Sequence, residues 1–173
     1  MANYEIYSAG ILPYTIYKGT TYLLLGRDSD NKWSDFGGRV EPKDRSDYEI
    51  TASREFFEET LGSVYDFDHV RKLIKKCPKI VSKTSAGHSY YMYLLKIQYT
   101  DIIRTKFLST KNFLSNVVTT IDKKYVEKND IRWVSIETVE HSIEGKSLIS
   151  LRSVFNNTFK YFKTEIDGYI KKE

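Results

Sequence analysis

Four charged residues in the segment 54–59, REFFEE, have types and spacing that suit metal chemistry. An α-helix turns about 100° per residue, so Glu55 and Glu59 would lie about 40° apart, with Glu58 about 60° to the other side of Glu55. Three carboxylates in one narrow sector repel one another, and like charges at this spacing destabilise a helix by roughly 0.2–0.5 kcal/mol. Such a cluster favours a bound cation. Oxygen ligands without Cys or His suit Mg²⁺ or Mn²⁺ rather than zinc.

The surrounding segment 37–62, GGRVEPKDRSDYEITASREFFEETLG, resembles the signature of the Nudix hydrolases. That signature is G-x5-E-x7-R-E-U-x-E-E-x-G-U, in which U is an aliphatic or bulky apolar residue. The half 54–59 matches it residue for residue, and Gly38 takes the place of the first glycine. The resemblance implies a Nudix-type α/β/α sandwich with a mixed β-sheet, formed by residues 1–173 as one domain.

The segment departs from the signature at three points. Asp44 stands where the family has Glu, and nine residues rather than seven separate it from Arg54. Leu61 occupies the position of the later glycine, and Gly62 follows one step on. We expect the two extra residues to lengthen the loop ahead of the helix, where insertions cost little. Gly62 can still end the helix in a left-handed conformation.

The resemblance assigns roles only to residues that match. Glu55, Glu58 and Glu59 resemble the metal-binding glutamates, and the carbonyl of Gly37 is a further expected ligand. Arg54 resembles the arginine that orients a carboxylate of the signature. Asp44 is then either the partner of Arg54 or a water-mediated ligand.

Family members commonly add one acidic residue from a distant loop, as a metal ligand or as the general base that activates water. Glu127, six residues before Trp133 in YVEKNDIRWV, is our first candidate, and Asp130 is the second. The segment 131–134, IRWV, resembles the strand that follows this loop in the family.

The implied reaction is attack of water on a phosphoanhydride, usually in a nucleoside diphosphate linked to a group X. Arg27 and Arg39 are candidate phosphate contacts, although Arg27 can equally be an exposed arginine at a strand end. Trp33 and Tyr91 are candidates for stacking on a base, an interaction worth about 1–3 kcal/mol. Tyr91 and Tyr93 share one face of an expected strand and Tyr90 the other, so one of these sets belongs to the core.

Three functions stay open. The first is a pyrophosphohydrolase acting on nucleotides or dinucleoside polyphosphates, and the second is an mRNA-decapping enzyme acting on 5′-capped RNA. The decapping alternative draws on the lysine-rich run 71–83 and on the basic, aromatic segment KSLISLRSVFNNTFKYFK, although that run also suits a solvated surface. The third is a non-catalytic module that binds a nucleotide or RNA, against which the intact glutamates argue.

Composition sets further bounds. The 173 residues are 40% hydrophobic with a net charge of +4, which is too weak alone to indicate nucleic-acid binding. No apolar run approaches the roughly 20 residues that span a bilayer, and residues 1–10 do not resemble a signal peptide. The one cysteine, Cys77, fits a reducing compartment. We therefore expect a cytoplasmic protein with no membrane partner, and homodimerisation is undecided.

Hydrophobic periodicity predicts the elements. Residues 7–17 and 21–26 are expected to form a hairpin around Lys18-Gly19, and residues 48–61 the acidic helix. HVRKLIKKC and KIVSKT are interpreted as strands around Pro78, and residues 88–99 as the strongest strand. The segment 101–122 is ambiguous between helix and loop. A short strand, IRWVSI, precedes a final amphipathic helix over about 148–170.

Overall fold

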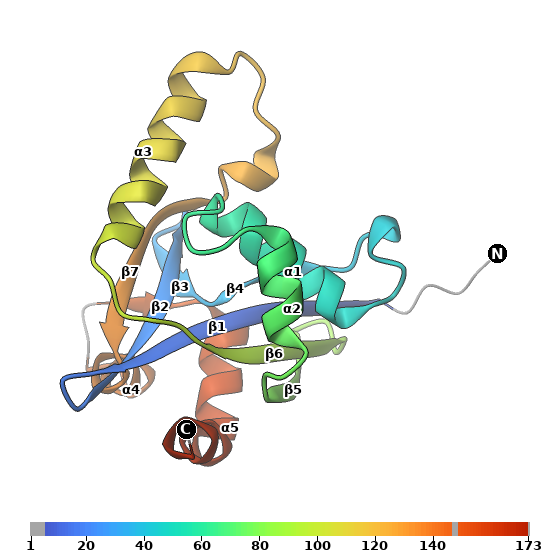
Figure 1. Cartoon of the computed structure of the whole chain (residues 1–173). Coiled ribbons are helices and arrows are strands. Elements are labelled where there is room, and N and C mark those ends of the chain that lie inside the picture. Colours follow the sequence, from blue (N-terminus) through green and yellow to red (C-terminus); the bar gives the residue numbers. More distant parts are fainter. Residues whose placement is uncertain (1–5, 147–148, 173) are drawn as a thin grey trace.

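The fold begins with a long antiparallel hairpin, seen in the computed structural model, which describes residues 6–146 and 149–172 (Figure 1). Its strands are β1 (Tyr7–Tyr17) and β2 (Thr20–Asp28), joined by Lys18 and Gly19. Both linking residues have positive φ, 50° and 79°, as the tight turns that match the twist of a hairpin require. The predicted hairpin is confirmed.

Beyond the hairpin, the chain crosses from one of its strands to the other. β3 (Lys32–Ser34) pairs with β2 near the end of that strand, whereas β4 (Phe36–Arg39) pairs with β1 near its start. Asp35 is the single residue between β3 and β4. The two hairpin strands therefore diverge at this end, and Asp35 lies in the fork between them.

Six of the strands follow one path, β5-β6-β1-β2-β3-β8, while β4 pairs with β1 and β7 with β2. The remaining bounds are β5 (Lys79–Lys83), β6 (Ser89–Lys96), β7 (Lys128–Ser135) and β8 (Ser150–Leu151). The β1–β6 and β3–β8 pairs are parallel and the others antiparallel, so the sheet is mixed as expected.

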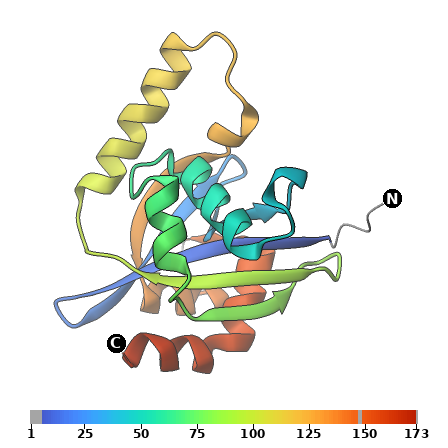
Figure 2. The ribbon, with the colours of Figure 1, turned by 45° about the vertical axis from the view of Figure 1, so that its right-hand side comes forward.

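Helices cover both faces of this sheet (Figure 2). α1 (Tyr48–Thr60) and α2 (Phe67–Ile74) pack on one face, and α4 (Ile136–Ile143) and α5 (Ser153–Lys171) on the other. Alternation along β6 sends Tyr91 and Tyr93 toward α1 and sends Tyr90 toward α5. The predicted α/β/α sandwich is confirmed.

The acidic helix α1 has clear local causes at both ends. The Asp47 side chain caps it by accepting hydrogen bonds from the backbone N–H groups of Glu49 and Ile50, at 2.9 and 3.1 Å. The helix ends at Leu61, whose φ of 53° is left-handed, and Gly62 is left-handed as well. A left-handed leucine costs about 1–2 kcal/mol. Placing the glycine at position 62 instead of 61 therefore lowers the stability of the helix end, although the helix still ends there.

The loop before α1 is where the two extra residues of the signature are expected. The loop forms a short 3-10 helix at Pro42–Asp44, and Arg45 and Ser46 then take positive φ values of 53° and 58°. This loop directs Asp44 inward, where its side chain is fully buried.

The strand prediction for HVRKLIKKC is wrong, because this segment contains most of α2. Asp66 caps the helix through the N–H of His69 at 2.8 Å, and Val70 and Ile74, four residues apart, form its buried face. The structure also resolves the ambiguous segment as α3 (Ile102–Val117), which protrudes from the body in Figure 1. A second 3-10 helix, Lys123–Tyr125, follows it on the return to β7.

The final helix was predicted to start near Leu148, which lies outside the described residues; α5 itself begins at Ser153 and is kinked at Phe162. Its residues Phe155, Phe159 and Ile166 pack in the hydrophobic core on the α4 and α5 side of the sheet, as their spacing predicts. In the described parts of the chain, no helix is both long enough and apolar enough to cross a membrane.

Candidate functional site

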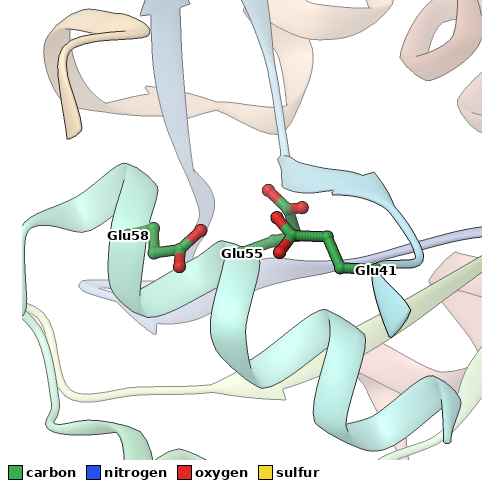
Figure 3. Close-up of side chains that lie close together, drawn as sticks. All are labelled: Glu41, Glu55 and Glu58. Carbon is green, nitrogen blue, oxygen red and sulfur yellow. The ribbon is translucent and has the colours of Figure 1, made fainter. Parts of the chain in front are cut away.

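Three carboxylates converge beside α1 (Figure 3). Glu55 and Glu58 project from α1, and Glu41 reaches them from the loop after β4. One oxygen from each lies within 4.8 Å of the other two, a spacing at which a single cation could contact all three. Glu41 was missed by the sequence reasoning, because helical periodicity can group only residues of the same helix. Its acidic character four residues after Gly37 was the available signal.

Arg54 organises this cluster. Its guanidinium donates to Glu55 at 2.8 Å and to Glu58 at 3.1 Å, and it lies 3.2 Å from a carboxylate oxygen of Glu41. On its other side, the guanidinium donates two parallel hydrogen bonds to Asp44, of 2.9 and 2.8 Å. Arg54 thus has the orienting position that the resemblance implies, and Asp44 is its partner.

Gly38 makes room for Glu55. A Cβ atom at position 38 would lie 2.6 Å from the Glu55 carboxylate carbon, closer than side chains ever approach. The Gly-Gly turn therefore serves the carboxylate cluster sterically, by letting the backbone pass directly beside it.

Glu59 lies deeper than its two neighbours. Its Oε2 accepts the N–H of Gly37 at 2.7 Å, and its Oε1 lies 3.4 Å from the ammonium of Lys128. That buried Oε1 has no hydrogen-bond partner in the described structure. Lys128 is itself buried and is shared with Asp28 at 2.6 Å and Ser34 at 2.9 Å. Glu59 thus contacts the predicted ligand residue Gly37 without joining the three-carboxylate cluster.

Burial governs the electrostatics of these glutamates. Burial raises the pKa of Glu55 to about 7, and Arg54 only partly offsets that rise. Burial likewise raises the pKa of Glu59 to about 8, against the opposing charge of Lys128. By contrast, burial of Asp44 is outweighed by the hydrogen bonds from Arg54, Glu41 and Thr51 together with the charge of Arg54, so the pKa of Asp44 falls.

Two lysines contact the cluster from outside. The ammonium of Lys124 lies 3.3 Å from Glu58 Oε1, and that of Lys43 lies 3.6 Å from the same atom. Lys43 also pairs with Glu41 at 2.9 Å. Cationic groups therefore already occupy the outer side of Glu58, which shows that this carboxylate attracts positive charge.

The donor set fits a divalent metal ion. Acidic oxygens predominate, the pKa values of two buried glutamates are raised by desolvation, and a buried oxygen of Glu59 lacks a hydrogen bond. A hard cation relieves each of these conditions. Glu41, Glu55 and Glu58 are the residues best placed to hold it.

A pocket of about 400 Å³ adjoins the cluster. Glu41 and Glu55 form one wall, and the predicted residues Gly37, Arg39 and Glu127 also line it. Arg152, Val154 and Phe155, at the start of α5, line it from the other helix layer. The pocket thus spans both helix layers, and its size is that of a small-molecule site.

Asp35 and Tyr90 lie at the inner end of this pocket. The Tyr90 hydroxyl donates a short hydrogen bond to Asp35 Oδ2, and both side chains are about 95% buried. Burial raises the pKa of Asp35 to about 6, partly offset by the hydrogen bond from Tyr90. The sequence reasoning did not single out Asp35.

Several predicted residues lie away from the pocket. Tyr91 stacks on Tyr48 with ring centroids 3.9 Å apart, on the α1 side of the sheet. Trp33 is buried beneath the guanidinium groups of Arg27 and Arg132, at 5.8 and 5.7 Å. None of these residues lines the pocket, so substrate contacts by Arg27, Trp33 and Tyr91 stay predictions that this arrangement does not favour.

Asp130, the second candidate for the extra acidic residue, is occupied elsewhere. Its buried carboxylate accepts from Arg104 at 2.8 Å and from Arg132 at 2.7 Å. Glu127 instead lies in the pocket wall and raises the pKa of Glu55 through its charge.

A mixed sheet between two helix layers, with an acidic helix behind a Gly-Gly turn, defines a Nudix fold. Solved structures agree over nearly the whole chain. An Ap4A hydrolase from C. elegans, in a binary complex, is 18% identical with a TM-score of 0.56, covering 94% of this chain and 99% of its own. The NUDIX domain of Shewanella oneidensis NrtR, complexed with ADP ribose, is 10% identical with a TM-score of 0.57, covering 95% and 90%.

A NUDIX hydrolase from Alicyclobacillus acidocaldarius is 11% identical with a TM-score of 0.53, covering 92% of this chain and 91% of its own. Comparison with protein-family models and with curated sequences found no match. The chain therefore has a Nudix fold, established by its architecture at low sequence identity.

Proposed function

We propose that this protein is a divalent-metal-dependent hydrolase that cleaves a phosphoanhydride in a nucleoside diphosphate linked to another group. The observation that carries the proposal is the convergence of Glu41, Glu55 and Glu58 beside a pocket large enough for a nucleotide, with Glu41 and Glu55 in the pocket wall. Structural neighbours described as an Ap4A hydrolase and as an ADP ribose complex support it.

In this proposal, Glu41, Glu55 and Glu58 hold Mg²⁺ or Mn²⁺, and the Gly37 carbonyl and Glu59 complete the ligand set. A metal ion at this place would neutralise charge on the phosphate oxygens and make a water molecule a stronger nucleophile. Arg54 keeps Glu55 and Glu58 oriented in the absence and presence of the ion, since Asp44 fixes its guanidinium.

Glu127 is the proposed general base. It lies in the pocket wall, close enough to Glu55 for its charge to affect that group. Arg39 lies on the same pocket and would bind the phosphates, because a guanidinium can donate two parallel hydrogen bonds to phosphate oxygens.

The test is hydrolysis of a substrate panel with Mg²⁺ or Mn²⁺. The panel contains nucleoside triphosphates, dinucleoside polyphosphates, nucleotide sugars, ADP-ribose and 5′-capped RNA. The wild type is compared with Glu58→Gln and with Glu137→Gln, an exposed glutamate on α4 that serves as a matched control. We expect metal-dependent turnover by the wild type and the control, and its loss by at least about 100-fold in Glu58→Gln.

The panel also separates the alternatives. Cleavage of capped RNA alone would assign decapping, and that binding should weaken steeply with salt because each phosphate contact releases counterions. Nucleotide binding without cleavage of any substrate would assign a non-catalytic module. Turnover that survives in Glu58→Gln would refute the proposed metal site.

A further inference from the structure

Asp35 lies where the two strands of the hairpin diverge, at the inner end of the pocket. Its neighbours in sequence are fixed on both sides, since Ser34 belongs to β3 and Phe36 to β4. A carboxylate that is only 5% exposed is costly to bury unless it makes polar contacts. Its presence here calls for an explanation that the metal cluster does not supply.

Tyr90 supplies one contact, and the backbone is shaped to allow it. A Cβ atom at Gly10 would lie 2.5 Å from the Tyr90 hydroxyl, and one at Gly37 would lie 2.9 Å from it. Two glycines on neighbouring strands thus open a slot through which the hydroxyl reaches Asp35 Oδ2. The orientation of the Asp35 carboxylate is therefore fixed.

The second oxygen of Asp35 is left for a ligand. Among the described residues, no other side chain donates a hydrogen bond to the Asp35 carboxylate, whose further polar contacts are its own backbone N–H and the charges of Lys128 and Arg152. Lys128 is engaged with Asp28, Ser34 and Glu59. Asp35 thus presents an oriented, buried acceptor to a pocket that adjoins the metal cluster.

The rest of the pocket suits a flat ring. Val154 and Phe155 give it an apolar side, and Arg152 offers a guanidinium plane that can stack on a ring. The carboxylate cluster at the other wall is where the phosphates would lie under the proposed function. A nucleotide with its phosphates there would extend its base toward Asp35.

We infer that Asp35, held by Tyr90, is a specificity-determining residue that selects nucleobases carrying an exocyclic amino group. This inference rests on the proposed function, because it needs the phosphates at the carboxylate cluster. An amino group donates a charge-assisted hydrogen bond to the free carboxylate oxygen. A carbonyl at the same ring position would place its oxygen, an acceptor, against the Asp35 carboxylate, which is also an acceptor. The carboxylate would then gain no hydrogen bond from that group.

The test is equilibrium binding of α,β-methylene diphosphates, which contain no cleavable anhydride between those phosphates. Adenosine is paired with purine riboside, and cytidine with its 4-deamino analogue, since in each pair hydrogen replaces the exocyclic amino group and no ring N–H donor is created. We expect wild type to bind the amino member about tenfold or more tightly. Asp35→Asn keeps the shape, accepts the Tyr90 hydroxyl and turns an amide N–H₂ to the pocket, so the preference should disappear or reverse.

Asp30→Asn, the same change in an exposed turn, is the control and should keep the wild-type ratio. Equal affinities within both wild-type pairs would overturn the inference, even if Asp35→Asn failed to fold. An unchanged preference in folded Asp35→Asn would also overturn it. Failure of catalysis is distinguishable from failure of this inference, because a protein that binds nucleotides at the cluster without cleaving them would hydrolyse nothing on the substrate panel and would still show these binding ratios.

Discussion

Arg54 and Asp44 form a two-pronged, buried ion pair, with Nε 2.9 Å from Oδ1 and Nη2 2.8 Å from Oδ2. The pair joins the loop that follows β4 to the middle of α1. Since Arg54 also donates to Glu55 and Glu58, the position of two carboxylates of the candidate metal site depends on a residue ten positions earlier in the chain. The shorter Asp at this position is fully compatible with the site, because the loop brings its backbone close to α1.

Asp44→Glu, which restores the residue of the Nudix signature, is expected to destabilise this protein. The Asp44 side chain is completely buried, and its Oδ2 already accepts from Arg54, from Thr51 Oγ1 and from the N–H of Glu41. An additional methylene would overpack the space at a cost of about 1–3 kcal/mol. Urea denaturation measures this, with Asp101→Glu as the exposed control. A variant as stable as the wild type would show that the loop can move to accommodate the longer side chain.

The sequence predicted those parts of the structure that depend on local signals. The residues of α1 carry an acidic pattern and a family signature, and the two agree. The segment of α2 failed because its lysines and its short apolar spacing, Val70 to Ile74, were interpreted without the cap at Asp66. The pairing of strands around Asp35 could not be predicted, since it depends on contacts between residues far apart in sequence.

The residues of the candidate site also differ in whether local sequence patterns predict them. Glu55 and Glu58 follow from helical spacing and Arg54 from the match to the signature, and the structure brings the three together. Glu41 and Asp35 come from loops whose paths no periodic pattern specifies. Tyr91 and Tyr90 illustrate the limit well, because alternation placed them on opposite faces but could not tell which face would adjoin the pocket.

Gly38→Ala should disable metal binding while leaving the fold intact. The three atoms nearest the new Cβ all belong to the carboxylate end of the flexible Glu55 side chain, at 2.6–2.7 Å, so that carboxylate must move out of the cluster. We expect Mn²⁺ affinity to fall by about tenfold or more, with thermal unfolding shifted by only a few degrees.

Gly10→Ala gives the contrasting comparison, because its Cβ would lie 2.5 Å from the backbone oxygen of Phe36. Backbone cannot move as cheaply as a side chain, so this variant should be clearly destabilised. Wild-type Mn²⁺ affinity in Gly38→Ala would contradict the role assigned to Glu55.

Metal affinity should rise with pH. Burial raises the pKa of Glu55 to about 7 and that of Glu59 to about 8, so at pH 6 both groups are largely protonated. A metal ion binds the ionised forms and must displace these protons. The apparent affinity should increase by up to about tenfold per pH unit for each proton released, and level off above about pH 8.

The effect of pH on stability has the opposite sign. In the metal-free protein, a carboxyl whose folded-state pKa is raised contributes stability that is full below the ordinary pKa and is lost as pH rises toward the folded value. These two groups therefore make the metal-free protein progressively less stable as pH rises from about 4.5 to 8. Bound metal should restore the lost stability. Mn²⁺ titrations at several pH values, together with melting curves with and without metal, test both statements; a pH-independent affinity would refute the first.

Lys124→Met is expected to strengthen metal binding. The Lys124 ammonium lies 3.3 Å from Glu58 Oε1, and its contact with Glu58 outweighs its desolvation and raises the pKa of Lys124. A cation at Glu58 must compete with that ammonium. Partly exposed ion pairs are worth about 0.2–1 kcal/mol, so removing this one should lower the Mn²⁺ dissociation constant by up to about fivefold.

Direct Mn²⁺ titration without substrate isolates this effect from any contact of Lys124 with phosphate. Lys106→Met removes an exposed lysine from α3 and should leave the constant unchanged. Weaker Mn²⁺ binding in Lys124→Met would mean that Lys124 supports the carboxylate cluster rather than competing for it.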